Sequence, residues 1–448
     1  MRELTAEWVA KAAGGRLVAG GPATPGPLRA TIDTRECGPG DLFVGLKGER
    51  VDGGAHADEA LANGAWGVLV APEHIDEATL AVPDGFAVIA ADDPLAALGS
   101  LARAWRRELG AKVIGVTGST GKTSTKDILA AVLAPHLETR ATHQNLNTEI
   151  GLPLTILEAP PGTQALVLEM AMRGEGQIAE LVAIAEPNVG VVVNVGPVHL
   201  ELLGTVERVA AAKAELIRDL GPHATCVVPA REPLLEQHLR DDIDTITFGP
   251  GGQVMLLSFD ARVGGRGGTA EIEAREESVV LDLPYDEPHN LINTLAAVAA
   301  ATAIGVKPVG RVDVQFSALR GEVVEIPGGV TVVNDCYNAN PMSMRAALKH
   351  LSETPAERRI AVLGTMAELG PDSESFHHEI GEEAAALGID MLITVGQEAL
   401  PYGATFDGET YAVPTPEEAG ALLADLALPG DRVLVKGSRS AGLERVLA

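Results

Sequence analysis

A lysine and a threonine follow a glycine turn in a segment that is typical of phosphate-binding loops. Residues 115–133 read GVTGSTGKTSTKDILAAVL: a buried strand, a turn with glycines, and a helix that begins near Lys122. Backbone N–H groups at a helix N-terminus attract phosphate oxygens, Lys122 supplies a cation, and the Thr123 hydroxyl can bind magnesium. The strict GxxxxGK[ST] pattern requires glycine where this chain has Val116, so an ordinary turn is the alternative. We expect phosphate binding by Thr117, Gly118, Ser119, Thr120, Gly121, Lys122, Thr123 and Ser124.

Two further side chains are candidates to hold a metal ion beside this loop. Glu169 lies toward the carboxyl end of the apolar run ALVLEMAM, where a carboxylate is costly unless it is paired or bound to metal. His199 follows the next apolar run, in NVGPVHLE, and is a candidate metal ligand beside Glu169 and Thr123. The alternatives are a strand that ends at a solvated Glu169, and a packed or surface histidine.

Lys213 lies on the apolar stripe of an expected helix. In GTVERVAAAKAELIRDL it shares the helical spacing of Val206 and Leu216, so it points at the protein core or at the site. The alternative is snorkelling, in which the lysine stem crosses apolar surface and the ammonium reaches water. The residues alone slightly favour snorkelling.

A polar turn follows a strand in the last third of the chain. The segment NDCYNANP places Asp335 at the strand end and Asn338 and Asn340 in the turn. Asparagines are common turn formers, so a binding role and an ordinary turn are equally open.

Three α/β segments must position these residues, since 448 residues exceed the usual size of one hydrophobic core. We expect a small α/β N-terminal domain at 1–95 and a central domain at 96–307. The central domain has buried parallel strands of the P-loop type, with antiparallel strands added at 250–280. Residues 308–448 alternate strands and helices, which predicts a Rossmann-like doubly wound sheet with ligands at the carboxyl ends of its strands.

Charge and hydropathy exclude several classes of partner. Lys and Arg number 34 against 62 Asp and Glu, and the net charge of -28 opposes binding to nucleic acid or anionic lipid. The N-terminus lacks the apolar core of a signal peptide, and the most apolar stretch, 291–306, is too short to span a membrane. We therefore expect a cytoplasmic protein without membrane insertion, and a monomer.

Together these motifs resemble the Mur ligase family, the ATP-dependent amide-forming ligases of peptidoglycan synthesis. The central ATPase domain of that family is similar to TGSTGKT, NLNTEIGLPLT, NVGPVHLELLG, AAAKAE and PHNLINTLAA, and its uridine-nucleotide domain to DTRECGPGDLFVGLKGER. YNANP, MAELG and VKGSRS resemble the member that joins D-alanyl-D-alanine to UDP-N-acetylmuramoyl-tripeptide. The resemblance implies ATP and two Mg²⁺ ions as cofactors, and activation of a substrate carboxylate as an acyl phosphate.

The resemblance also implies roles for individual residues. Residues 117–124 would hold the ATP phosphates, Asn290 the adenine and Asp335 the ribose. One magnesium would be bound by Thr123 and Glu169, and the second by His199 and a carbamylated Lys213. The implied catalytic residues are Lys122, Glu169, His199 and Lys213. The substrates would contact Thr34, Arg35 and Lys47 near the uridine diphosphate, Asn145, Asn147 and Thr148 near the sugar, and Tyr337, Asn338 and Asn340.

The chain departs from the family pattern at three places. Arg320 precedes Gly321, and Glu322 stands where an arginine is expected to brace ATP. Position 54 is glycine instead of histidine, and Thr365 replaces the usual aspartate. Two alternatives stay open: another ligase of the superfamily, such as a folylpoly-γ-glutamate synthase, and a P-loop nucleotide switch that hydrolyses ATP without a peptide acceptor.

Overall fold

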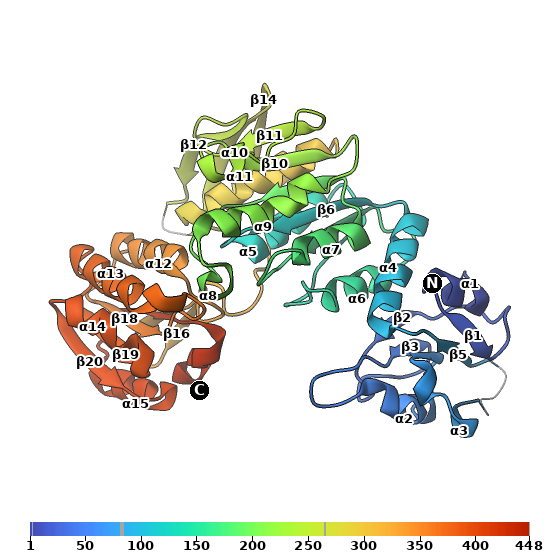
Figure 1. Cartoon of the computed structure of the whole chain (residues 1–448). Helices are drawn as coiled ribbons and strands as arrows, with labels where there is room; N and C mark the ends of the chain where they lie inside the picture. Colours follow the sequence, from blue (N-terminus) through green and yellow to red (C-terminus); the bar gives the residue numbers. More distant parts are fainter. Residues whose placement is uncertain (2, 81–84, 264–265, 448) are drawn as a thin grey trace.

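The computed structural model describes the whole chain except residues 2, 81–84, 264–265 and 448. Three sheets succeed one another along the sequence, and the central one lies between the other two (Figure 1). This arrangement confirms the predicted α/β fold. The division at 95/96 and 307/308 stays a prediction. The short strand β15 (Gly310–Arg311) pairs with the edge of the central sheet.

The N-terminal sheet has five strands in the order β1-β5-β4-β3-β2. Its strands are β1 (Arg16–Ala19), β2 (Arg29–Thr31), β3 (Asp41–Val44), β4 (Gly67–Val70) and β5 (Ala87–Ala90). Its helices are α1 (Ala6–Ala12), α2 (Ala57–Ala62) and α3 (Glu77–Leu80). Strands β2 to β5 are parallel and β1 is antiparallel to β5.

The central sheet has ten strands in the order β15-β14-β13-β12-β11-β10-β9-β6-β8-β7. The strands that follow one another in sequence are β6 (Lys112–Thr117), β7 (Thr139–Ala141), β8 (Ala165–Glu169), β9 (Val189–Val192), β10 (Thr225–Pro229), β11 (Asp244–Phe248), β12 (Val254–Ala261), β13 (Gly268–Ala274) and β14 (Glu277–Leu283). Strands β6 to β11 are parallel, and the predicted antiparallel addition is confirmed by the pairing of β12, β13 and β14.

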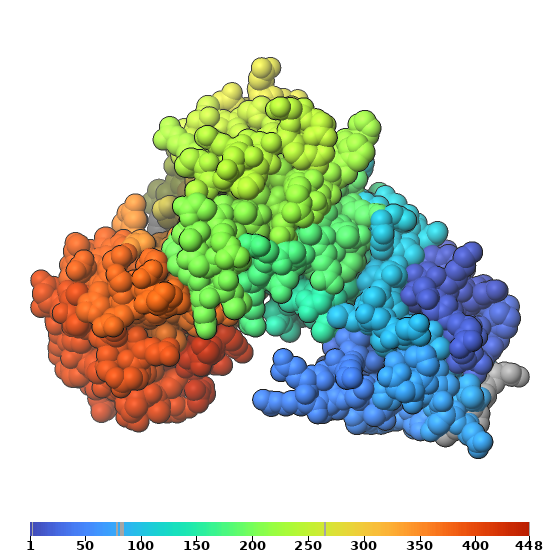
Figure 2. Space-filling model, in the orientation of Figure 1, coloured from blue at the N-terminus to red at the C-terminus, as the bar shows by residue number. Residues whose placement is uncertain are grey.

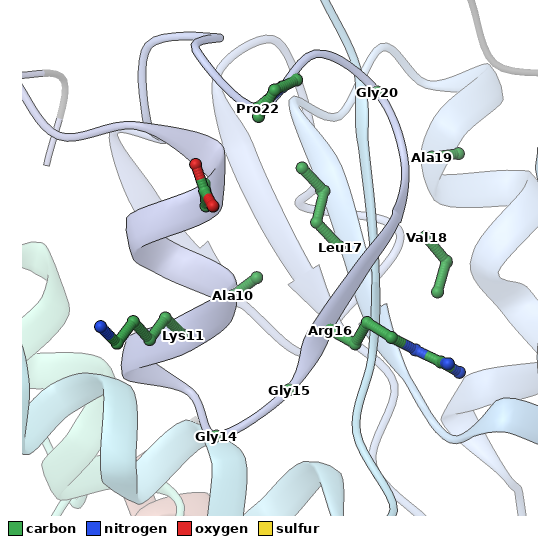
Figure 3. A pocket seen from close by; sticks show the side chains of 11 residues that line it. Ala10, Lys11, Gly14, Gly15, Arg16, Leu17, Val18, Ala19, Gly20 and Pro22 are labelled. Carbon is green, nitrogen blue, oxygen red and sulfur yellow. The ribbon is translucent and has the colours of Figure 1, made fainter.

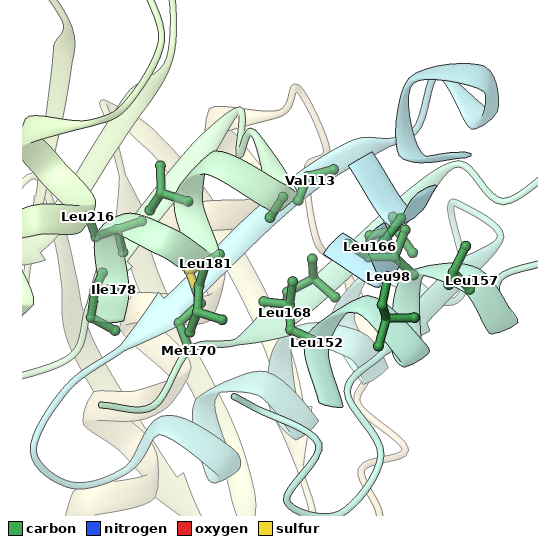
Figure 4. Packing of buried hydrophobic residues seen from close by; sticks show 14 of the residues in the cluster. Leu98, Val113, Leu152, Leu157, Leu166, Leu168, Met170, Ile178, Leu181 and Leu216 are labelled. Carbon is green, nitrogen blue, oxygen red and sulfur yellow. The ribbon is translucent and has the colours of Figure 1, made fainter. Parts of the chain in front are cut away.

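Helices cover both faces of the central sheet, because its middle strands are apolar on both sides. On β8, Leu166 and Leu168 pack toward α4 (Pro94–Leu109) and α6 (Gly151–Glu158). Ala165 and Val167 pack toward α5 (Lys122–Leu133) and α11 (Pro288–Ala303). Figure 4 shows the first of these two layers, with Val113 of β6 among leucines of the covering helices. The helices are α4 (Pro94–Leu109), α5 (Lys122–Leu133), α6 (Gly151–Glu158), α7 (Gln177–Ala185), α8 (Leu200–Leu203), α9 (Val206–Arg218), α10 (Pro233–Glu236) and α11 (Pro288–Ala303).

The C-terminal sheet has six strands in the order β16-β17-β21-β18-β19-β20, all parallel except β16. The strands are β16 (Glu322–Ile326), β17 (Val330–Asn334), β18 (Arg359–Gly364), β19 (Met391–Val395), β20 (Glu409–Val413) and β21 (Arg432–Lys436). The helices are α12 (Pro341–Glu353), α13 (Ser373–Ala386), α14 (Leu400–Thr405) and α15 (Pro416–Leu426). In the described part of the chain, no helix has both the length and the apolar character needed to cross a bilayer.

Strand order decides which side chains meet. Strand β6 lies between β8 and β9, and Val116 is level with Glu169 on one side and Val191 on the other. The carboxyl ends of these parallel strands therefore bring together the loop after β6, the carboxylate at the end of β8 and the segment after β9.

Candidate active site

The loop between β6 and α5 is held in shape by Asn194, a residue in the segment that follows the neighbouring strand β9. The side-chain oxygen of Asn194 accepts hydrogen bonds from the N–H groups of Ser119 at 3.1 Å and Thr120 at 2.9 Å. Gly121 has φ 73°, and a Cβ there would lie 2.7 Å from the side-chain oxygen of Asn293, so only glycine fits. Sequence reasoning missed Asn194; its signal was a polar residue directly after the apolar run at 189–193.

The start of α5 offers unused donors for an anion. Among the described residues, the N–H groups of Gly121, Lys122, Thr123 and Ser124 find no acceptor, because they form the first turn of the helix. Such a turn suits phosphate oxygens. The N–H groups of Ser119 and Thr120 donate to Asn194 instead, and phosphate binding by residues 117–124 stays a prediction.

Two lysines share one acceptor in the loop. The carbonyl oxygen of Gly118 accepts hydrogen bonds from Lys122 Nζ at 2.8 Å and from Lys213 Nζ at 3.0 Å. Lys213 is only 2% exposed, so the snorkelling alternative is wrong. Burial lowers the pKa of Lys213 well below its ordinary value, and the charge of Lys122 lowers it further. A bound phosphate or carboxylate would balance the positive charge that Lys122 places at this oxygen.

Glu169 is buried at 2% exposure, so the alternative of a solvated strand end is wrong. Its N–H donates to the hydroxyl of Thr142, and its Oε1 accepts from the Asn147 amide at 2.8 Å. The other carboxylate oxygen, Oε2, is buried without a hydrogen-bond partner. Such an oxygen fits a metal ligand. Asn147, expected near the sugar, thus holds the Glu169 carboxylate here.

The donor set matches magnesium more closely than a transition metal. The described residues contain no cluster of three histidine, cysteine or acidic side chains that would hold a metal without help. Mg²⁺ is usually bound by one or two carboxylates together with substrate phosphates and water. The buried Thr123 on α5 and the unpartnered Glu169 oxygen fit that mode, because nucleotide phosphates would complete the ligands.

His199 follows β9 and lies partly buried between two charged groups. Its Nδ1 is hydrogen-bonded to Glu368 of the C-terminal domain. Burial lowers the pKa of His199, and Glu368 opposes this effect, whereas the nearby Lys213 and Lys122 reinforce it. The charges of the lysine pair thus act on His199, and its role as a metal ligand stays a prediction.

The C-terminal turn has local roles for its asparagines. Asn338 accepts a hydrogen bond from the Ala339 N–H, and Asn340 caps α12 by accepting from Ser343 N at 3.0 Å. Their oxygens thus serve the turn and the helix, and contacts to substrate stay a prediction. Asp335 is paired with the buried Lys436 at 2.5 Å.

Arg320 lies two positions before Glu322, which stands where an arginine is expected to brace ATP. Its guanidinium lies 4.1 Å from the centre of the Tyr337 ring, and its Nε is buried without a partner. Its charge also contributes to lowering the pKa of Lys122, after the larger effect of burial, so it lies close to the loop. Glu322, which occupies the place expected for an arginine, is exposed on β16. Arg320 is therefore a candidate from the C-terminal domain to act on the phosphate loop, and its role in binding ATP is a prediction.

Asn290 and Asp335 come from different domains and lie in one region. Asn290 is 7% exposed near the start of α11, and its oxygen accepts from Asn293 at 3.3 Å. Burial lowers the pKa of the adjacent His289 to about 4, while the negative charge of Asp335 opposes this shift. The negative charge of Asp335, which follows β17, thus affects the pKa of His289 at the beginning of α11.

The remaining predicted residues lie outside this cluster. Arg35 is exposed and paired with Asp33, and the Thr34 carbonyl accepts from Asn63. The backbones of Lys47 and Asp52 pair in an isolated antiparallel β-bridge. The Asn145 carbonyl accepts from Asn147 N–H, and the Thr148 carbonyl accepts from the first turn of α6. Their substrate contacts stay predictions.

Position 54 has no room for the histidine expected there. A Cβ on Gly54 would lie 2.2 Å from the ring of His74, which fills this space and approaches Asp52 at 3.2 Å.

A separate hollow between α1 and β1, lined by residues from Glu7 to Pro22, contains none of the predicted site residues (Figure 3).

Comparison with known proteins shows which families of domains the chain resembles. The Mur ligase middle domain matches residues 116–301. The domain described as "Mur ligase, glutamate ligase domain" matches residues 319–439. The domain described as "Mur ligase family, catalytic domain" matches residues 30–106. The UDP-N-acetylmuramoyl-tripeptide--D-alanyl-D-alanine ligase of Bacillus subtilis is 36% identical over 425 residues, which cover 93% of this chain and 91% of the relative.

Two solved structures are similar over nearly the whole chain. MurF from Acinetobacter baumannii has a TM-score of 0.88 and 30% identity, covering 99% of this chain and 97% of that one. MurF ligase from Thermotoga maritima, solved in complex with ADP, has a TM-score of 0.82 and 33% identity, covering 94% and 96%. With the phosphate loop, its lysine pair and the buried carboxylate, these matches show that the chain belongs to the Mur ligase family.

Proposed function

We propose that this protein is an ATP-dependent ligase that joins D-alanyl-D-alanine to UDP-N-acetylmuramoyl-tripeptide in peptidoglycan synthesis. The observation that carries the proposal is the pair Lys122 and Lys213 on the Gly118 carbonyl, beside a helix turn with free N–H groups and a buried unpartnered carboxylate. The similarity to ligases of this name over almost the whole chain supports the choice of substrates.

The chain's own residues would bind and align two anionic reactants. A carboxylate is a poor acyl donor until a phosphate is attached to its oxygen, which explains the need for ATP. The turn 121–124 would hold the phosphates, and Lys122 would cancel their charge during transfer. Two Mg²⁺ ions, one held by Thr123 and Glu169 and one by His199 and a carbamylated Lys213, would screen the repulsion between carboxylate and triphosphate.

The three domains would contribute to one reaction. Figure 2 shows the N-terminal and C-terminal domains on either side of a wide opening below the central domain. The tripeptide substrate would enter this opening with its uridine part on the N-terminal domain, near Thr34, Arg35 and Lys47. Closure of the flanking domains would exclude water from the acyl phosphate. We infer that the enzyme works as a cytoplasmic monomer.

Release of inorganic phosphate tests this function. With ATP and Mg²⁺, the full chain should release phosphate at an appreciable rate only when both the UDP-tripeptide and D-alanyl-D-alanine are present, because the acyl phosphate must be consumed by the amine. A coupled colorimetric assay with each substrate omitted in turn measures this dependence. Phosphate release with ATP alone would favour a nucleotide switch, and release driven by a single amino acid or by a folate would favour another ligase of the superfamily.

Arg320→Ala should lower kcat about tenfold, since a charge-assisted contact to phosphate contributes roughly 1.5 kcal/mol. Its Nε has no partner in the described structure, so the side chain is available to nucleotide. The matched control is Arg311→Ala, which removes an exposed arginine whose ion pair, within the described part of the chain, is with Asp313, and it should leave kcat unchanged. Equal kcat values for Arg320→Ala and the unaltered enzyme would remove Arg320 from the phosphate site.

A further inference from the structure

Glu368 of the C-terminal domain reaches across to the central domain and meets the histidine of the site. It lies in the turn between β18 and the short helix η3 (Gly370–Asp372). One carboxylate oxygen is hydrogen-bonded to His199 Nδ1, and the other lies 3.6 Å from Arg173 Nε. The Glu368 carbonyl also accepts from the Glu201 N–H at 3.2 Å. One residue thus makes three contacts with the neighbouring domain.

The backbone on both sides of this contact is unusual. His199 has φ 54° and Glu368 has φ 63°, the left-handed region that residues other than glycine rarely adopt. Gly370 packs against the same central segment, since a Cβ there would lie 3.2 Å from the Glu201 Cα. Strained conformations persist where surrounding contacts require them, and they often occur at functional sites.

The contact to Glu368 fixes which nitrogen of His199 is available. A carboxylate accepts hydrogen bonds, so Nδ1 is the donor to Glu368, and in the neutral imidazole Nε2 then has a free lone pair. In the described part of the chain, Nε2 makes no hydrogen bond. The charges of Lys213 and Lys122 act on the ring, which places it next to the phosphate loop.

We propose that Glu368 is a positioning residue that holds His199 in the form with Nε2 free to bind metal, and that docking of the C-terminal domain thereby completes the metal site. The inference rests on the proposed function. Carboxylates that orient a metal-binding histidine typically contribute 10-fold to 100-fold to metal affinity. The new element is that the carboxylate belongs to another domain, so the ligand is oriented only while the two domains are in contact.

Glu368→Ala tests the proposal with two readouts that need no substrate. In the metal-free full chain labelled with ¹⁵N-histidine, the His199 ring signals, assigned by their loss in His199→Asn, should change from the Nδ1–H form to a mixture of tautomers. When Mn²⁺ is titrated in, the concentration that broadens these signals by half should rise roughly 10-fold to 100-fold. Glu368→Gln should restore most of both properties, because its amide oxygen can accept the same proton.

The control is Glu374→Ala, which removes an exposed carboxylate on α13 whose partner among the described residues is His378, at a long 3.7 Å. It should change neither readout, and circular dichroism should show all variants folded. An unchanged tautomer, or an unchanged Mn²⁺ midpoint, in Glu368→Ala would overturn the proposal. Both readouts are taken without ATP or peptide. They therefore test the role of Glu368 independently of the phosphate-release assay, which tests the proposed function.

Discussion

Lys213→Ala should reduce kcat about 10²-fold to 10³-fold while the protein stays folded, as expected for loss of one electrostatic group in an active site. Lys213 is 2% exposed and donates to the Gly118 carbonyl beside Lys122. Burial and the Lys122 charge lower its pKa, which favours the neutral amine. A neutral amine is the form that reacts with carbon dioxide.

The reaction forms a bond between Nζ of the neutral amine and the carbon of CO₂ and releases one proton, so that a neutral amine becomes an anionic carbamate. The carbamate would balance the charge of Lys122 and supply an oxygen ligand for magnesium. Lys213→Arg should therefore be as inactive as Lys213→Ala, because a guanidinium keeps the charge and cannot form this group. A short carboxylate such as acetate should restore part of the activity of Lys213→Ala by entering the vacated space.

Steady-state kinetics and ¹³C NMR with ¹³C-bicarbonate measure these effects. The unaltered protein should show a carbamate signal that Lys213→Ala lacks. The matched control is Lys349→Ala, which removes a lysine that is 63% exposed on α12 and should keep both the signal and the activity. Full activity of Lys213→Arg, or no carbamate signal in the active enzyme, would refute carbamylation.

Lys122→Ala should likewise abolish acyl-phosphate formation, with a loss of about 10²-fold to 10³-fold in rate. Lys122 is the lysine at the N-terminus of α5, where its Nζ lies 2.8 Å from the Gly118 carbonyl. It is therefore placed to cancel charge on phosphates bound by the same turn. Trapping the acyl phosphate with hydroxylamine measures the step directly.

The same variant should affect the neighbouring lysine. Removing Lys122 removes a charge that lowers the pKa of Lys213, so that pKa should rise in Lys122→Ala. Less of the neutral amine would then be present, and the carbamate signal should weaken. Near-normal turnover of Lys122→Ala, with Lys112→Ala on the exposed start of β6 as the control, would remove the phosphate-loop assignment.

Short sequence patterns were sufficient to predict the phosphate loop and the strands of the sheets. The loop from Thr117 to Lys122 depends on neighbours in the chain: a buried strand, two glycines and a helix start. Apolar runs predicted the central parallel strands, because strands covered on both faces require apolar side chains on both. The helical stripe likewise predicted that Lys213 points inward or along the surface, and left the choice between the two open.

Only the tertiary structure decided how the distant residues meet. Strand β6 pairs with β8 and β9, which do not follow it directly in sequence, and this order brings Glu169 and Asn194 to the loop. Packing of α9 on the sheet determined that Lys213 is buried instead of snorkelling. Contact between domains brought Glu368 to His199, which the resemblance of MAELG to the family did not predict. Residues far apart in sequence meet through sheet order and domain packing, which depend on burial over the whole molecule and not on any local pattern.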